Sequence, residues 1–208
     1  MSTNTIEWAA FTLKSSVSET QLLSASDAMQ REFLDQQHGF LKRDLLSFGE
    51  GQYADCVVWE SREVADLAMQ DAVKFSSCMH YFDLLQIDAS PLHGTSLRQH
   101  QCSTSLDDFG GMEFSLFRLR AGAQMNQLRP AAHILTQGLY CDEPGYLGHH
   151  IVHDGKGQFA DVLFADTAQR ARQICDKWGT GPFVEPCKPY LDLIDHASVS
   201  MQFWHRLT

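Results

Sequence analysis

Three histidines, His149, His150 and His153, lie close together in the second half of the chain. Imidazole nitrogens are common ligands of transition metals, so a metal site is the first chemistry that this cluster suggests. The neighbouring glycines and the hairpin that follows favour a strand, however. On a strand that rises about 3.3 Å per residue, His149 and His153 would share a face but lie roughly 13 Å apart, and His150 would point to the other face. We therefore expect no metal site here and a pocket-lining or pairing role for His149, with an exposed His153.

Two carboxylates of the first half recur at matching positions in the second half: Glu7 matches Glu113, and Asp55 matches Asp161. The side chains expected around the aspartates are apolar: Leu45 and Phe11 near Asp55, Ile151 and Phe117 near Asp161. A carboxylate in such surroundings has a raised pKa unless it is paired or hydrogen-bonded, as in many general acids and bases. The alternative interpretation is structural: each aspartate fixes a hairpin, and the glutamates, which begin strands, are solvated.

Further candidates for a pocket wall are tryptophans and isolated charged residues. Trp59 has Ala165 as its counterpart, so the two halves should contain cavities of different size, although a core tryptophan is the simpler interpretation. The complete set of candidates has five residues in each half: Glu7, Arg43, Asp55, Trp59 and His80 in the first, and Glu113, His149, Asp161, Trp178 and Trp204 in the second. Asp55, Asp161, His149 and His80 are the candidates for catalysis, and the others are candidates for ligand binding.

An internal repeat determines which elements carry these side chains. A shift of 106 positions aligns residues 6–65 with 112–171 without a gap, and YFDLL (81–85) matches YLDLI (190–194) at a shift of 109. The second copy therefore contains a three-residue insertion near GTGPFVEPCKP (179–189), which could shape a pocket mouth or form an inert surface loop. Because the register holds across a strand, a helix and a hairpin, we interpret the repeat as a duplicated fold.

Each copy has the same order of expected elements. A strand rich in aromatic and aliphatic residues (6–14, 112–120) precedes a helix whose apolar residues recur at three- and four-residue spacing. Two strands joined by a Gly-x-Gly hairpin follow, then a second helix with Val64, Ala68, Ala72, Phe75, Met79 and Phe82 along one stripe, and a last strand (95–104, 198–207). This β-α-β-β-α-β order predicts a ferredoxin-like unit in residues 1–104 and another in 112–208, with 105–111 as the linker.

The arrangement resembles the dimeric α/β-barrel superfamily, which includes antibiotic biosynthesis monooxygenases and stress-responsive barrel proteins. The resemblance rests on Gly-aromatic-Leu at the second strand (39–41, 145–147) and on VVWES (57–61) before a helix. It implies an α+β fold in which the two antiparallel sheets pack as a barrel within one chain, or in a homodimer. It also implies a small organic ligand, a cofactor-independent monooxygenase-like activity, or a barrel that binds a ligand or partner without catalysis.

Haem is a third possibility that the resemblance raises. The superfamily's haem-degrading members use an asparagine on the first strand and a tryptophan and a histidine on the second helix. Here Asn4 precedes the strand, the tryptophan positions hold Ala68 and Ile174, and only His80 lies near the place of the haem-ligating histidine. We therefore expect no cofactor, with haem as the alternative that His80 would support.

Composition narrows the classes of partner. The net charge of −10 and a pI near 5.3 oppose binding to nucleic acid or to an anionic membrane surface. No stretch resembles a secretion signal or a transmembrane span, and the six cysteines, which contain no C-x-x-C pair, fit reduced thiols in a cytoplasmic protein. Walker, G-x-S-x-G, H-E-x-x-H and Rossmann patterns are also missing from the sequence.

Overall fold

The structure, a computed structural model, describes residues 4–49, 51–87, 90–102, 106, 109–179 and 183–208. The chain divides into two compact units, residues 1–95 with Thr208 (unit 1) and residues 96–207 (unit 2). This division falls nine residues before the end that the sequence suggested for the first domain. Within the expected linker, residues 105, 107 and 108 lie outside the described part, whereas Phe109 is buried and Gly111 already begins a strand.

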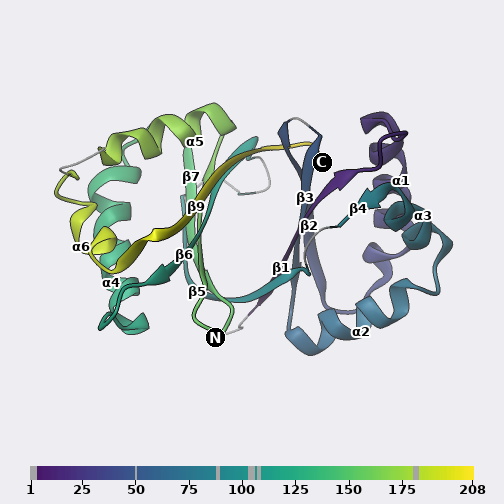
Figure 1. Cartoon of the computed structure of the whole chain (residues 1–208), viewed down its shortest axis with the longest axis horizontal. Helices are drawn as coiled ribbons and strands as arrows, with labels where there is room; N and C mark the ends of the chain where they lie inside the picture. The colour runs from purple at the N-terminus through teal and green to yellow at the C-terminus, as the bar shows by residue number, and fades with distance from the viewer. Residues whose placement is uncertain (1–3, 50, 88–89, 103–105, 107–108, 180–182) are drawn as a thin grey trace. The chain divides into compact units, whose positions relative to one another are not determined.

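Unit 1 has an antiparallel sheet with helices on one face (Figure 1). Its strands are β1 (Thr5–Leu13), β2 (Phe40–Gly49), β3 (Gln52–Trp59), β4 (Leu85–Gln86) and the first part of β5 (Leu92–Gln101). Strand β1 pairs with β3 on one side and with β4 and β5 on the other, and β2 pairs with β3. Its helices are α1 (Glu19–Glu32), η1 (Leu34–Gln36), α2 (Arg62–Ala72) and α3 (Ser76–Leu84).

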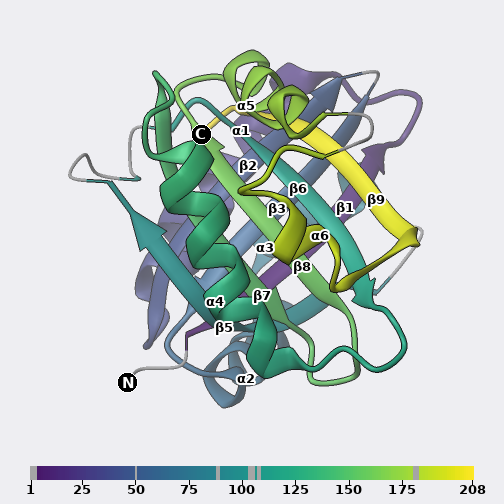
Figure 2. The same cartoon turned by 90° about the vertical axis from the view of Figure 1, so that its left-hand side faces the viewer.

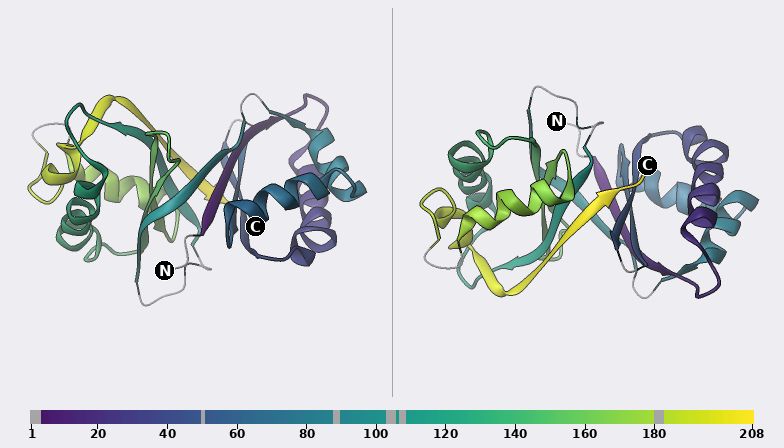
Figure 3. Two further views of the ribbon diagram at one scale, coloured as in Figure 1. Left: turned by 90° about the horizontal axis from the view of Figure 1, so that it is seen from below. Right: turned by 90° about the horizontal axis from the view of Figure 1, so that it is seen from above.

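Unit 2 repeats this plan, with its helices lying over its strands (Figure 2). Its strands are β6 (Gly111–Leu119), β7 (Tyr146–His153), β8 (Phe159–Ala165) and β9 (Ile194–Arg206). Strand β6 lies between β8 and β9, and β7 pairs with β8. The helical segments are α4 (Met125–Leu135), η3 (Thr136–Tyr140), α5 (Ala168–Cys175), η4 (Asp176–Trp178) and α6 (Lys188–Leu191). In both units all helices lie on one face of the unit's strands (Figure 3), which confirms the predicted ferredoxin-like plan.

The repeated glycines form the hairpins. Gly49 and Gly51 have φ values of 93° and 78°, and Gly155 and Gly157 have values of 73° and 97°. Residues with a side chain rarely adopt such positive φ values, so glycine at these positions allows both tight hairpin turns. The hairpins set the register that the sequence predicted, with Leu45 opposite Asp55 and Ile151 opposite Asp161.

One predicted element was wrong in its extent. The stripe from Val64 to Phe82 forms two helices, because the chain turns after Ala72 and Phe75 adopts an extended conformation (φ −104°, ψ 125°). The turn changes the helical phase: Met79 is exposed, whereas Cys78 and Tyr81 are buried. The first helix begins at Glu19, with Ser18 as its N-cap in a capping box with Gln21.

The core of each unit lies between its helices and its sheet, where Leu22, Leu45 and Tyr81 in unit 1 and Leu128, Ile151 and Tyr190 in unit 2 are fully buried. All six cysteines carry free thiols. Among the described helices, none has the length and apolar composition needed to cross a membrane.

Candidate functional site

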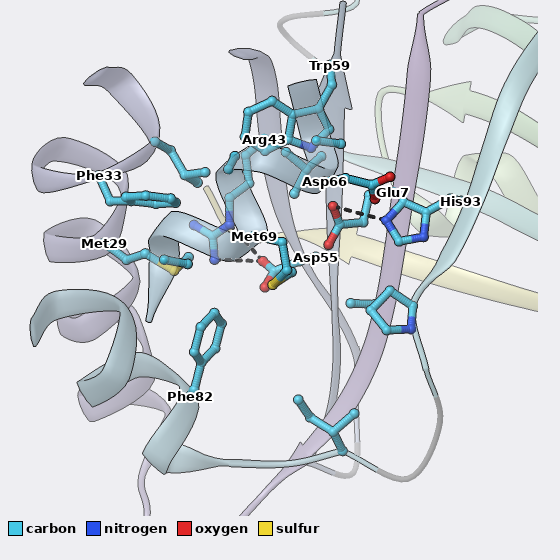
Figure 4. Close-up of a pocket in the computed structure, with 18 of the residues that line it drawn as sticks. Glu7, Met29, Phe33, Arg43, Asp55, Trp59, Asp66, Met69, Phe82 and His93 are labelled. Carbon is cyan, nitrogen blue, oxygen red and sulfur yellow. Dashed lines mark hydrogen bonds and ion pairs between the residues drawn. The ribbon is translucent and has the colours of Figure 1, made fainter. Parts of the chain in front are cut away.

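A cavity of about 570 Å³ opens between the helices and the sheet of unit 1 (Figure 4). Its wall is mainly apolar, and the labelled helical side chains Met29, Phe33, Met69 and Phe82 lie around it. The sheet contributes Phe11 from β1 and Val57 and Trp59 from β3. These strand residues share one face because side chains alternate along a strand, and the same alternation brings Glu7 and Asp55 to the cavity.

The first polar group in the wall is a buried cluster around Arg43. Its Nε and Nη2 lie 2.8 and 2.6 Å from Oδ1 of Asp55, Nη1 donates to the Ser26 hydroxyl at 2.8 Å, and Nη2 contacts the Tyr81 hydroxyl at 3.0 Å. Tyr81 donates to Oδ2 of Asp55 at 2.8 Å. Both oxygens of Asp55 are therefore occupied, as is expected for a buried charge that folding must compensate.

The electrostatics of this cluster follow from burial and pairing. Burial lowers the pKa of Arg43, but its charge interactions and hydrogen bonds with Asp55 and Tyr81 together outweigh burial and leave that pKa above its ordinary value. Burial raises the pKa of Asp55, and the Arg43 charge and the Tyr81 hydrogen bond oppose the rise. With its oxygens held by Arg43 and Tyr81, Asp55 is better placed to fix Arg43 than to accept a proton from a ligand.

The second polar group is a looser pair. Oε2 of Glu7 on β1 lies 3.5 Å from Nε2 of His93 on β5, and both side chains line the cavity (Figure 4). The pairing of β1 with β5 places these two residues opposite each other. Trp59 lies in the same wall, and its buried Nε1 has no hydrogen-bond partner among the described residues. The wall thus combines an acid, an imidazole and a donor that a ligand's oxygen could use.

Unit 2 holds a related but altered cluster. His149 occupies the place of Arg43, and its Nε2 donates to Oδ1 of Asp161 at 2.9 Å, while its Nδ1 lies 2.8 Å from the Thr136 hydroxyl. Tyr190 corresponds to Tyr81 by the repeat. Its hydroxyl is buried beside Asp161, and burial, the Asp161 charge and a hydrogen bond to Asp161 raise the pKa of Tyr190 well above its ordinary value. The contact between tyrosine and aspartate in unit 1 therefore has a counterpart in unit 2, and the main change is that His149 replaces Arg43.

The cavity of unit 2, about 240 Å³, is smaller than that of unit 1. At the repeat positions of Ala68 and Ala72, which line the larger cavity, unit 2 has Ile174 and Trp178. Ile174 is fully buried, and Trp178 stacks on Tyr140 with ring centroids 6.4 Å apart. These larger side chains fill space that is open in unit 1. The expected difference in cavity size is present, although helix positions outweigh the exchange of Trp59 for Ala165.

The remaining candidates lie away from the larger cavity. His80 is exposed on α3 and is not part of the cavity wall, so it does not fit a haem ligand there. Trp204 is buried in β9 and does not line the smaller cavity, which Asp161 and Trp178 do line. Glu113 is fully buried; it accepts a hydrogen bond from Ser115, and burial with the nearby Asp161 charge raises its pKa well above the ordinary value.

Sequence reasoning missed four members of these clusters: Ser26, Tyr81, His93 and Thr136. Tyr81 had a signal, because it matches Tyr190 in the segment repeated at a shift of 109. The position of His93 depends on a strand pairing that no local pattern indicates. Ser26 and Thr136 lie on helical segments, where a polar residue on the buried face was the available sign.

No protein-family profile and no curated protein matches the sequence significantly. Solved structures are similar along nearly the whole chain. An anthrone oxidase-like protein has a TM-score of 0.65 and 11% identity over 100% of this chain and 92% of its own. A ferredoxin fold protein from Listeria monocytogenes, related to antibiotic biosynthesis monooxygenases, has a TM-score of 0.55 and 11% identity over 100% of this chain and 96% of its own.

A heme-degrading enzyme from Listeria monocytogenes has a TM-score of 0.50 and 11% identity over 97% of this chain and 98% of its own. At these identities the likeness concerns the fold. It confirms the predicted α+β fold with ferredoxin-like units, and a shared fold does not establish a shared activity.

Proposed function

We propose that unit 1 binds a small, largely apolar organic molecule in its cavity and acts on it as a cofactor-independent, monooxygenase-like enzyme. The observation that carries this proposal is the wall of the 570 Å³ cavity. It is mostly apolar but contains the Glu7–His93 pair and the unpartnered Nε1 of Trp59. Small-molecule sites have this volume and this combination of apolar walls with a few polar groups.

The proposed substrate class is an aromatic molecule with an acidic C–H next to its ring system and an oxygen that accepts a hydrogen bond from Trp59. Anthrone is such a molecule, and one structural neighbour is an anthrone oxidase-like protein. In the proposed reaction, dioxygen is the oxidant. A base removes a proton from the CH₂ group, and the carbanion donates its electrons to O₂. One oxygen atom stays on carbon as a carbonyl and the other leaves as water.

Glu7, with His93 beside it, is the proposed base. The two side chains are 3.5 Å apart, a loose pairing that leaves room for a proton to be accepted at this wall. Asp55, a catalytic candidate from the sequence, is assigned a positioning role because its oxygens are held by Arg43 and Tyr81. Arg43 would then keep this part of the wall rigid.

A non-catalytic binding protein is the second candidate. The observation that favours it is the same Arg43–Asp55–Tyr81 cluster, whose polar groups satisfy one another and so serve the fold without a ligand. Under this alternative the cavity still binds an apolar molecule, but no oxygen is consumed.

Oxygen uptake with anthrone tests the proposal, together with the appearance of anthraquinone in the absorbance spectrum. Glu7→Gln should lower turnover at least tenfold while binding persists. Glu60→Gln, which changes an exposed carboxylate just after β3, is the matched control and should keep the wild-type rate. Binding without oxygen uptake in the wild-type protein would support the non-catalytic alternative. Neither binding nor uptake would refute both.

We also propose a cytoplasmic location, which the six free thiols support. Assembly as a monomer or as a homodimer is decided by light scattering on the purified full chain. A cytoplasmic protein of this kind should retain free thiols when titrated with a thiol reagent under denaturing conditions, and quantitative disulfide formation would contradict the assignment.

A further inference from the structure

Four basic side chains of unit 2 lie on two neighbouring elements, outside both cavities. Arg98 and His100 come from β5, and Arg129 and His133, one helical turn apart, come from α4. Helix α4 lies beside this part of β5 (Figure 2), and Nη2 of Arg129 donates to the carbonyl oxygen of Leu97 at 2.6 Å. In a chain with a net charge of −10, such a basic cluster is a local exception that attracts a negatively charged ligand.

Arg98 is the half-buried member of the cluster, and it forms no ion pair with a carboxylate of the described residues. Its Nη1 lies 3.4 Å from Nδ1 and 3.5 Å from the carbonyl oxygen of His149, which are two long contacts. Nε and Nη2 carry three of the five N–H donors and have no hydrogen-bond acceptor among the described residues. The carboxylate of Asp161 attracts Arg98, but Nε2 of His149 holds it at 2.9 Å. Arg98 can therefore offer an oxyanion two parallel hydrogen bonds.

The electrostatics of the cluster have the direction expected for an anion site. Burial lowers the pKa of Arg98, and the attraction of its neighbours does not outweigh burial. Arg43 in unit 1 shows the opposite direction, because its interactions within the Asp55 cluster outweigh burial. Burial also lowers the pKa of His100, and nearby positive charges, with Arg98 first and His133 among them, lower it further. A bound anion would reverse both effects.

Two further groups place donors beside Arg98. Nδ1 of His100 lies 3.0 Å from the Tyr146 hydroxyl, and the two rings are stacked with centroids 6.1 Å apart. When this hydroxyl donates, Nε2 of His100 carries the hydrogen. The amide nitrogen of Gln137 lies 3.4 Å from that Nε2 and donates to Sγ of Cys141 at 3.3 Å. In this tautomer two donors face each other, and an oxygen placed beside them would accept from both.

We propose that unit 2 binds a phosphate group between β5 and the α4–η3 segment, with Arg98 as its main contact. Nε and Nη2 of Arg98 donate to two phosphate oxygens, and His100 and Gln137 donate to a third. His133 adds positive charge from the exposed side of α4. A phosphate presents oxygens in several directions, whereas a carboxylate presents two in one plane, so donors from a strand and from a helical segment fit the phosphate. Inorganic phosphate and a phosphate monoester share this chemistry.

Titration calorimetry at constant ionic strength tests the site with three probes. Inorganic phosphate should bind one ion per chain, at least tenfold more tightly than acetate, because acetate leaves the donors of His100 and Gln137 unused. Phenyl phosphate distinguishes the two sources: tighter binding than inorganic phosphate assigns the site to an organic phosphate, and equal or weaker binding assigns it to the ion itself. Acetate binding as tight as phosphate binding, or no binding of either phosphate probe, would overturn the proposal.

Matched variants locate the bound phosphate. Arg98→Gln should weaken phosphate binding at least tenfold, the effect of losing hydrogen bonds from a charged group. Arg118→Gln is the control, because it removes the same charge from an exposed arginine on β6, which β8 and β7 separate from β5. It should bind phosphate as the wild type does. His133→Gln, at an exposed position, should weaken binding about threefold, as expected for one solvated charge.

Equal weakening in Arg98→Gln and Arg118→Gln would refute the site, because it would show only a general attraction between phosphate and positive charge. Unchanged phosphate binding in His133→Gln would refute it as well. Because His133 lies outside the core, its variant decides the question even if Arg98→Gln does not fold.

Discussion

Transplanting two side chains of unit 2 into unit 1 should close the larger cavity. Ala68 and Ala72 line it, and their counterparts are Ile174 and Trp178. The double change Ala68→Ile/Ala72→Trp adds about twelve non-hydrogen atoms. Since a water molecule occupies about 30 Å³ of the liquid, the added atoms fill on the order of half of the 570 Å³ cavity.

The expected result is a loss of anthrone affinity of at least tenfold, which corresponds to about 1.4 kcal/mol or more. Filling an empty apolar space adds contacts, so the free energy of unfolding should stay constant or rise by about 1–2 kcal/mol. Affinity is measured by fluorescence titration and stability by urea unfolding. The control, Leu67→Ile/Gln70→Trp, places the same side chains on the exposed face of the same helix.

Unchanged affinity in the filled variant, with the control also unchanged, would refute the assignment of the cavity as the binding site. A loss of stability of more than about 3 kcal/mol would instead show that the space is not open, because overpacking a filled core has that cost. A blocked site lowers the anthrone affinity while the free energy of unfolding stays constant or rises. A damaged fold lowers both.

Three further outcomes follow from the clusters. Arg43→Met should destabilise unit 1 by about 3–5 kcal/mol in urea unfolding, because it leaves the Asp55 charge buried and unpaired; a loss below about 1 kcal/mol would show that the pair is not needed. The pKa of Glu113 is raised well above 4.5 in the folded state by burial, so the folded protein retains this proton and stability should fall as the pH rises above about 4.5. Glu113→Gln should remove that part of the decline and leave stability near pH 4 unchanged, and an equally steep decline in the variant would contradict the shift. Any Soret band that appears on adding hemin should persist in His80→Ala, since His80 lies outside the cavity wall; its disappearance would restore His80 as the haem ligand.

The helices and strands could be predicted from the sequence because each expected element occurs in both copies of the repeat. Glycines that need positive φ, such as Gly49 and Gly155, mark the hairpins, and the hairpins fix the register that brings Leu45 opposite Asp55. The split between α2 and α3 was missed because the apolar stripe continues through the turn at Phe75. Apolar residues keep a helical spacing on both sides of this turn, so their spacing alone does not reveal that one helix ends and another begins.

The candidate site was predictable where strand alternation alone places a side chain. Glu7, Arg43, Asp55 and Trp59 share the cavity face of adjacent strands and were identified together. His93 was not, because its position opposite Glu7 depends on a pairing between strands far apart in the sequence. His80 was chosen for its distance along the chain, and the turn before α3 rotates it into solvent.

A crystal structure of the full chain soaked with anthrone tests the central claim most directly. The account predicts density for the molecule in the cavity of unit 1, with its carbonyl oxygen within hydrogen-bond distance of Nε1 of Trp59 and its CH₂ group facing the Glu7–His93 pair. Density elsewhere on the chain, or an empty cavity at a concentration that saturates binding in solution, would contradict it.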